Sequence, residues 1–196
     1  RDSHNALMPL EFGQMMLRTS IVVIALILLP ACLGVVLAAT PDDINIDGDL
    51  SEWDSDTLMG IDSNSSIAFR MTWNESHLFL AWEGTDWAST SEGADLFVYL
   101  NTTDGGSPLS KEWHLSQTLP FSADFAFVLE DLSYSSLQTY DGSGWVAADQ
   151  TGVEAFAGWS DNQNTEISIP WANIGSPTSL AVIAWAQWQD EGNVWT

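Results

Sequence analysis

The sequence has few positively charged residues. Only 4 of its 196 residues are Lys or Arg, against 27 Asp and Glu, and the formal net charge is −23. Such a field repels nucleic acid and anionic membrane surfaces, so we expect no nucleic-acid partner. The carboxylates are spread along the chain rather than gathered in a tail. This favours a solvated surface suited to a saline medium, with weak cation binding as the alternative.

Cysteine is nearly absent as well. Cys32, the single cysteine, lies in an apolar amino-terminal stretch, so the rest of the chain has no disulfide and no thiolate metal site. The sequence also lacks a phosphate-binding glycine loop, an HExxH motif and a G-x-S-x-G motif. A pair of carboxylates could hydrolyse a glycoside, but so many Asp and Glu produce such pairs by chance. We therefore predict a non-catalytic protein, leaving open a catalytic domain beyond Thr196.

The amino-terminal part has the pattern of an export signal. An apolar run at residues 21–29 follows Arg18 directly, and small residues end the stretch near Ala39. The stretch is nearly long enough to span a bilayer, so an uncleaved anchor is the alternative. We predict that residues 1–40 form a signal or anchor helix with an upstream extension, the chain's only membrane contact. Residues 41–196 would then be secreted or lie at the cell surface.

After the leader, hydrophobicity follows the period of a β-strand. Apolar residues alternate in 67–73, a turn is expected at 74–77, and alternation resumes in 78–83, which predicts a β-hairpin. Regularly spaced short strands of this kind are typical of an all-β, antiparallel two-sheet β-sandwich. We expect one domain over residues 41–196, truncated before its last strand. Further strands are predicted at 95–101, 123–130, 134–140, 145–148, 153–159, 165–169 and 179–188.

The most distinctive motif opens this domain. Residues 44–53 (INIDGDLSEW) contain an Asp47-Gly48 turn followed by Glu52 and Trp53. Asp caps a tight turn with its side chain, and Gly accepts a positive φ there. We expect this motif to close one end of the sandwich.

The opening motif, the hairpin, the strand at 95–101 and residues 166–171 together resemble family 9 carbohydrate-binding modules and the related DOMON-like domains. The resemblance implies a two-sheet sandwich that clamps a sugar between two tryptophans, often with structural calcium. By position, Trp87 and Trp195 stand nearest to the two clamping tryptophans. The group also contains haem-binding domains, so haem binding is a third option.

Tryptophan is abundant, with 11 residues. Sugars pack their C–H faces on flat aromatic rings while their hydroxyls meet polar side chains. Trp73 and Trp82 fall on the apolar side of the hairpin and are expected in the core, and Trp53 and Trp171 belong to motifs that the fold uses. The carbohydrate-binding candidates are the tryptophans in predicted loops or strand edges: Trp87, Trp113, Trp145 and Trp195.

Arg70 is a further carbohydrate-binding candidate. The predicted hairpin places it opposite Ala81 and diagonal to Glu83. The simpler interpretation is a cross-strand ion pair with Glu83, worth about 0.2–1 kcal/mol. In the functional interpretation, its guanidinium donates to a sugar hydroxyl or a glycan carboxylate.

Calcium is the candidate cofactor. Asp47, Asp49 and Glu52 belong to a dense acidic cluster, and Ca²⁺ takes about six to eight oxygen ligands. The spacing is not that of an EF-hand loop, so this hypothesis depends on the family resemblance.

The leading hypothesis is an exported, non-catalytic, carbohydrate-binding module of a larger extracellular protein. The alternative is a structural or adhesive surface domain, whose tryptophans fill its core and which binds no small ligand.

Overall fold

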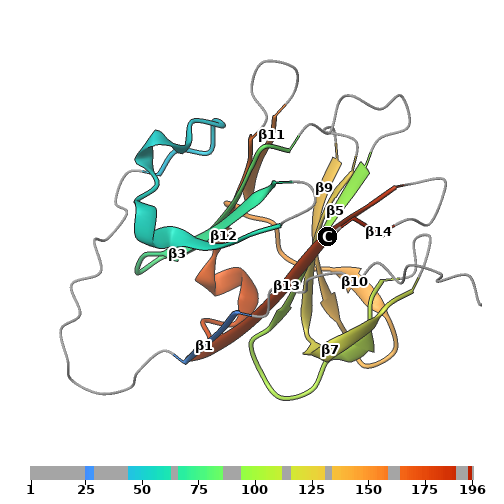
Figure 1. Ribbon diagram of the computed structural model, residues 1–196. Helices are drawn as coiled ribbons and strands as arrows, with labels where there is room; N and C mark the ends of the chain where they lie inside the picture. Colours follow the sequence, from blue (N-terminus) through green and yellow to red (C-terminus); the bar gives the residue numbers. More distant parts are fainter. Residues whose placement is uncertain are drawn as a thin grey trace, which may run out of the picture.

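The computed structural model describes residues 25–28, 44–62, 66–85, 94–111, 116–130, 134–158, 164–188 and 194–195. Figure 1 shows that the fold is built from strands, which form two large antiparallel sheets and one small hairpin. The predicted all-β, two-sheet architecture is therefore confirmed. Short 3-10 turns occur at η1 (Leu50–Glu52), η2 (Ser55–Thr57) and η4 (Trp171–Ile174).

The larger sheet, here called sheet A, has the strand order β1-β13-β5-β8-β9-β10, and β14 also pairs with β13. Its strands alternate between core-facing and outward-facing side chains, as expected for a sheet covered on both faces. The strands are β1 (Ala25–Leu28), β5 (Ala94–Asn101), β8 (Phe125–Glu130), β9 (Tyr134–Tyr140), β10 (Trp145–Ala147), β13 (Ser179–Trp188) and β14 (Val194–Trp195).

The second sheet, here called sheet B, has the order β11-β12-β4-β3-β2. Its centre is the predicted hairpin, in which Arg70 lies opposite Ala81, so that prediction is confirmed. The strands of sheet B are β2 (Leu58–Ile61), β3 (Ala68–Trp73), β4 (His77–Glu83), β11 (Glu154–Ala157) and β12 (Asn164–Pro170). A separate hairpin joins β6 (Ser107–Leu109) to β7 (Thr118–Ala123).

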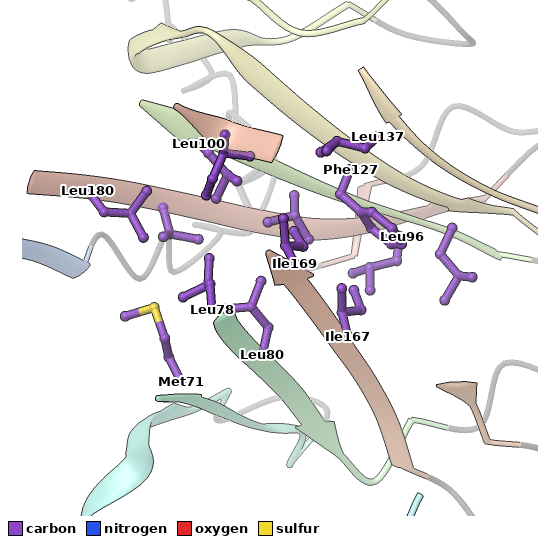
Figure 2. Close-up of a cluster of buried hydrophobic side chains, with 14 of the residues drawn as sticks. Met71, Leu78, Leu80, Leu96, Leu100, Phe127, Leu137, Ile167, Ile169 and Leu180 are labelled. Atoms are coloured by element: carbon purple, nitrogen blue, oxygen red, sulfur yellow. The ribbon is translucent and has the colours of Figure 1, made fainter. Parts of the chain in front are cut away.

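The main hydrophobic core lies between the two sheets. Figure 2 shows side chains of both sheets pointing toward one another, with Phe127 and Leu137 of sheet A facing Leu80 and Ile167 of sheet B. All four are fully buried. Trp82 belongs to this core, as predicted, whereas Trp73 is only half-buried. Burial of the inward-facing apolar residues on both sheets supplies the main driving force for folding.

The single strand predicted at 123–130 is interrupted in the structure. Asp124 separates β7 from β8, and its buried carboxylate accepts hydrogen bonds from the backbone N–H and hydroxyl groups of Thr102 and Thr103. The carboxylate thus fixes the bend that follows β5. An alternating pattern cannot show this break, because the break depends on contacts distant in the sequence.

Part of the predicted leader also differs from expectation. Residues 25–28 form the edge strand β1, antiparallel to residues 179–182 of β13, and not the predicted helix. Ile and Leu suit a strand that satisfies the backbone of an otherwise open sheet edge. The rest of residues 1–40 lies outside the described residues, so the predicted export signal stays a prediction. Within the described ranges no helix has the length and hydrophobicity needed to cross a membrane.

Each sheet carries a cover on its outer face. Residues 44–57, here called the opening segment, pack Ile46, Leu50 and Trp53 onto Phe79 and Ala81 of sheet B. The β6–β7 hairpin covers the outer face of sheet A, where a second apolar cluster forms. The molecule thus has three apolar layers: the main core and one layer beneath each cover.

Candidate functional site

The opening segment is held by a buried carboxylate. Glu166, on the outer side of β12, is completely buried, and its Oε1 accepts a hydrogen bond from Trp53 Nε1 at 2.7 Å. Its Oε2 accepts from the backbone N–H groups of Asp47, at 3.1 Å, and Gly48. Gly48 has φ of 87°, a conformation that favours glycine. The Asp-Gly turn and Trp53 therefore serve to dock this segment on sheet B.

Burial governs the protonation of Glu166. Loss of water contact raises the pKa of its carboxyl above the ordinary value, and the N–H donors of Trp53, Gly48 and Asp47 only partly offset this. The net shift is upward. The arrangement is consistent with a structural role, because the carboxyl is enclosed by the groups that it anchors.

The three carboxylates predicted to hold calcium accept local hydrogen bonds. Asp47 accepts from the backbone N–H of Asp49, and Asp49 accepts from that of Ser51, both at 2.9 Å. Glu52 accepts from the backbone and side-chain nitrogens of Asn45 at 2.8 and 2.6 Å. Across the part of the chain that the structure describes, no three His, Cys, Asp or Glu side chains are grouped so as to hold a metal. Calcium binding stays a prediction.

Arg70 forms the ion pair that its register predicts. Its Nη2 lies 3.1 Å from Glu83 Oε2, and Nη1 donates a long hydrogen bond of 3.5 Å to Thr57 Oγ1. Arg70 projects from the outer face of sheet B, because the neighbouring Phe69 and Met71 pack into the main core. The guanidinium is therefore committed to joining β3, β4 and the opening segment.

The four candidate tryptophans are not all placed. Trp87 and Trp113 lie outside the described residues. Trp195 belongs to β14, where its backbone lies opposite Ala186 of β13. Trp145 is half-buried in β10, the last strand of sheet A. Trp145 and Arg70 lie on opposite sides of the main core, so these two candidates do not share one site.

The outer face of sheet A carries a stack of aromatic rings. Trp185 stacks on Tyr99 and Phe97 with ring centroids 4.9 and 6.0 Å apart. All three side chains are buried beneath the β6–β7 hairpin, where Leu119 and Ala123 contact the cluster. Trp185 Nε1 is buried and has no hydrogen-bond acceptor among the described residues. The stack is therefore mainly a second apolar core and not an open binding surface.

Trp145 marks the accessible margin of this stack. Its ring packs edge-on against Tyr99 and Tyr140, with centroids 5.6 and 5.7 Å away. In the turn before it, the Asp141 carboxylate accepts hydrogen bonds from the Ser143 N–H and hydroxyl and from the Gly144 N–H. These donors, the Ser143 hydroxyl chief among them, lower the pKa of the Asp141 carboxyl.

Lys111 lies on the same face. Its backbone N–H donates to Tyr99 Oη at 2.9 Å, and its Nζ donates to Gln138 Oε1 at 2.8 Å. Gln138 lies two residues from Tyr140 on β9, and Tyr140 is directly opposite Trp145. The Lys111–Gln138 pair and the Trp145 indole therefore lie on the same face of sheet A. Partial burial lowers the pKa of the Lys111 amine. We call Tyr99, Lys111, Gln138, Tyr140 and Trp145 the aromatic edge site.

Sequence reasoning found only Trp145 of this set. Lys111 carried one available signal, since it and Arg70 are the only basic residues after Thr40. Tyr99 and Gln138 carried none, because their position depends on the pairing of β5, β8 and β9.

Comparisons with known proteins gave no match: no protein-family model, curated protein or solved structure is significantly similar to the chain. The resemblance to carbohydrate-binding and DOMON-like domains therefore stays a prediction.

Proposed function

We propose that the protein is an exported, non-catalytic β-sandwich module of a larger extracellular protein, and that it binds carbohydrate at the aromatic edge site. The observation that carries the proposal is the half-exposed indole of Trp145, fixed edge-on by Tyr99 and Tyr140. A fixed aromatic face next to hydrogen-bonding side chains is what recognition of a pyranose requires.

The polar part of the site supports the same proposal. Gln138 is buried and its amide bonds Lys111 and Ser136, so Lys111 is the donor and Asp141, in the turn before Trp145, the acceptor for a sugar. Sugar hydroxyls need partners of both kinds. Because the turn at Asp141 and the contacts of Lys111 are already formed, binding would order few side chains. The export signal predicted in residues 1–40 is the basis for the external location.

The alternative function is a structural or adhesive surface domain without a small ligand. Burial of Phe97, Tyr99 and Trp185 favours this alternative, since these three rings fill a core on this face. The two functions differ in what Trp145 does: it contacts a ligand in one and only packs against Tyr99 in the other.

A glycan array tests the proposal. The complete chain and the Trp145→Ala variant are compared, with Tyr134→Ala as the control, because Tyr134 is also an aromatic residue of sheet A and is 46% exposed. We expect glycan binding by the native chain and the control, and a loss of about 10- to 30-fold in affinity in Trp145→Ala, as for a central aromatic contact. A folded native chain that binds no glycan would support the structural alternative.

A further inference from the structure

We infer that Asn74, in the turn between β3 and β4, is a site of N-linked glycosylation, and that the matching triplet at Asn101 is not. The acceptor sequence for this modification is Asn-X-Ser/Thr, in which X is not proline. The inference goes beyond carbohydrate binding and rests only on the export part of the proposed function. It is carried by the different ways in which the fold uses the two triplets.

Two acceptor triplets begin within the described residues. Asn74-Glu75-Ser76 follows β3, and Asn101-Thr102-Thr103 begins at the last residue of β5. A third begins at Asn64, which lies outside the described residues. An attached glycan is bulky and needs a surface position in an exported protein. The surroundings of each asparagine therefore decide which triplet a folded protein can carry in modified form.

The turn at Asn74 lies at the surface. Glu75 and Ser76 are exposed, and Asn74 is half-buried. Asn74 Oδ1 accepts hydrogen bonds from the Ser76 N–H at 2.9 Å, from the Ser76 hydroxyl at 3.0 Å and from the His77 N–H at 2.8 Å. Trp171 donates to the backbone carbonyls of Asn74 and Ser76, at 2.9 Å each. The amide oxygen of Asn74 thus organises a local turn at the tip of a hairpin.

The transfer reaction changes only the nitrogen of this amide. Asn74 Nδ2 forms a bond to C1 of the first sugar of an oligosaccharide that is carried on a lipid pyrophosphate. The bond between C1 and the pyrophosphate oxygen breaks, the lipid pyrophosphate leaves with the bonding electrons, and Nδ2 gives up one proton to a base of the transferase. A side-chain amide has two N–H donors and a carbonyl acceptor, so the product keeps one N–H and Oδ1. The hydrogen bonds that Oδ1 accepts within the turn are therefore compatible with the glycan.

Asn101 is placed differently. It ends β5, which pairs with β13 on one side and with β8 on the other. It lies on the same face of sheet A as Tyr99, two residues away, which is buried beneath the β6–β7 hairpin. Thr102 is buried, and its hydroxyl and that of Thr103 donate to Asp124 Oδ2 at 2.6 and 2.8 Å. A glycan at Asn101 would crowd the cover of sheet A and these contacts, so we expect no folded protein modified there.

The experiment expresses the complete chain in eukaryotic host cells, whose secretory pathway carries out this transfer. Glycans of the secreted protein are released by a peptide N-glycosidase in heavy-oxygen water, which labels each modified asparagine, and chymotryptic peptides are analysed by mass spectrometry. Cleavage at Phe69 separates Asn64 from Asn74. We expect the label at Asn74 and none at Asn101.

Variants of the third residue of each triplet test the assignment. Ser76→Ala removes the hydroxyl that the acceptor sequence requires but leaves Asn74 in place, so it should abolish the label. Ser76→Thr keeps a hydroxyl and should keep the label. Thr103→Ala is the matched change in the other triplet and should leave the pattern of the native chain unchanged.

The outcomes separate the inference from the proposed function. A secreted native chain with an unmodified Asn74, or with a glycan at Asn101, overturns the inference and leaves carbohydrate binding at Trp145 intact. A label at Asn74 that survives in Ser76→Ala overturns the assignment to the triplet. A chain that is not exported overturns both the glycosylation site and the external location. A labelled Asn74 in a chain that binds no glycan on the array supports the inference and contradicts only the carbohydrate-binding proposal.

Discussion

The outer faces of the two sheets are both covered, but they are held in different ways. On sheet B, the opening segment is fixed by one buried carboxylate, Glu166, which accepts hydrogen bonds from Asp47, Gly48 and Trp53. On sheet A, the β6–β7 hairpin lies over a stack of aromatic rings, and the stack ends at the half-exposed Trp145. The cover of sheet B combines an apolar layer with polar contacts, chiefly those of Glu166, whereas sheet A has an accessible aromatic margin.

We assign different roles to the two outer faces: a structural role to that of sheet B and ligand binding to that of sheet A. The motif most recognisable in the sequence, residues 44–53, completes a core on sheet B and engages its polar groups internally. The chemistry suited to a ligand lies on sheet A, where no contiguous motif marks it.

Removal of the Glu166 carboxyl should have the largest effect. Glu166→Ala leaves the N–H groups of Trp53, Asp47 and Gly48 without their acceptor, and hydrogen bonds to charged groups are worth about 1.5–3 kcal/mol each. We expect the free energy of unfolding to fall by about 3–4 kcal/mol, measured by urea denaturation. Glu154→Ala, which removes an exposed carboxylate from the adjacent strand β11, is the control and should change stability by less than about 0.5 kcal/mol. A loss below about 1 kcal/mol for Glu166→Ala would contradict the account.

Replacing Trp53 tests the same contact from the other side. Trp53→Phe keeps an aromatic ring but removes the indole N–H that Glu166 Oε1 accepts at 2.7 Å. We expect a destabilisation of about 1.5–3 kcal/mol, measured by thermal and urea unfolding. In the Glu166→Ala background the same substitution should cost much less, because the partner is already absent. Additive effects would mean that the two residues do not act together.

The protonation of Glu166 gives a pH-dependent test. Because burial raises the pKa of Glu166 in the folded state, its protonated form is favoured on folding. This contribution to stability is fully present below the ordinary carboxyl pKa and is lost as pH rises through the raised folded pKa. The stability difference between native and Glu166→Ala proteins should therefore shrink with rising pH in that window, by at most about 1.4 kcal/mol per pH unit. A difference that grows with pH would show a lowered pKa instead.

The matching substitution on sheet A should have the smallest effect. Trp185→Phe also removes an indole N–H, but that donor is buried without an acceptor among the described residues. The gain from removing an unsatisfied donor offsets the loss of packing, so we expect a change within about 1 kcal/mol of zero. A loss as large as that of Trp53→Phe would show that Trp185 has a polar partner and would weaken the contrast between the two faces.

The sequence predicted the architecture because the architecture depends on local alternation. The hairpin register and the Arg70–Glu83 pair both follow from counting residues across the turn at 74–77. The bend at Asp124 and the docking role of Glu166 could not be found in this way. Both depend on donors more than 20 residues away in the sequence, which no local pattern encodes.

The candidate site was predicted only in part for the same reason. Trp145 is visible as an aromatic residue at a strand edge. Its ring neighbour Tyr99 lies on β5, which the pairing of β5, β8 and β9 brings close to β10, and Lys111 is placed by its hydrogen bond to Tyr99. The binding candidates Arg70 and Trp145 appeared equivalent as sequence, yet the main core lies between them.

The indole N–H signals of a two-dimensional NMR spectrum test the central claim most directly, because Trp53 and Trp145 report on the two faces separately. The native chain is titrated with a glycan that it binds, and each signal is assigned by the Trp53→Phe and Trp145→Phe variants. The account predicts that the Trp145 signal shifts in proportion to occupancy while the Trp53 signal stays in place. A shift of Trp53 with an unchanged Trp145 would place the ligand on sheet B and contradict it.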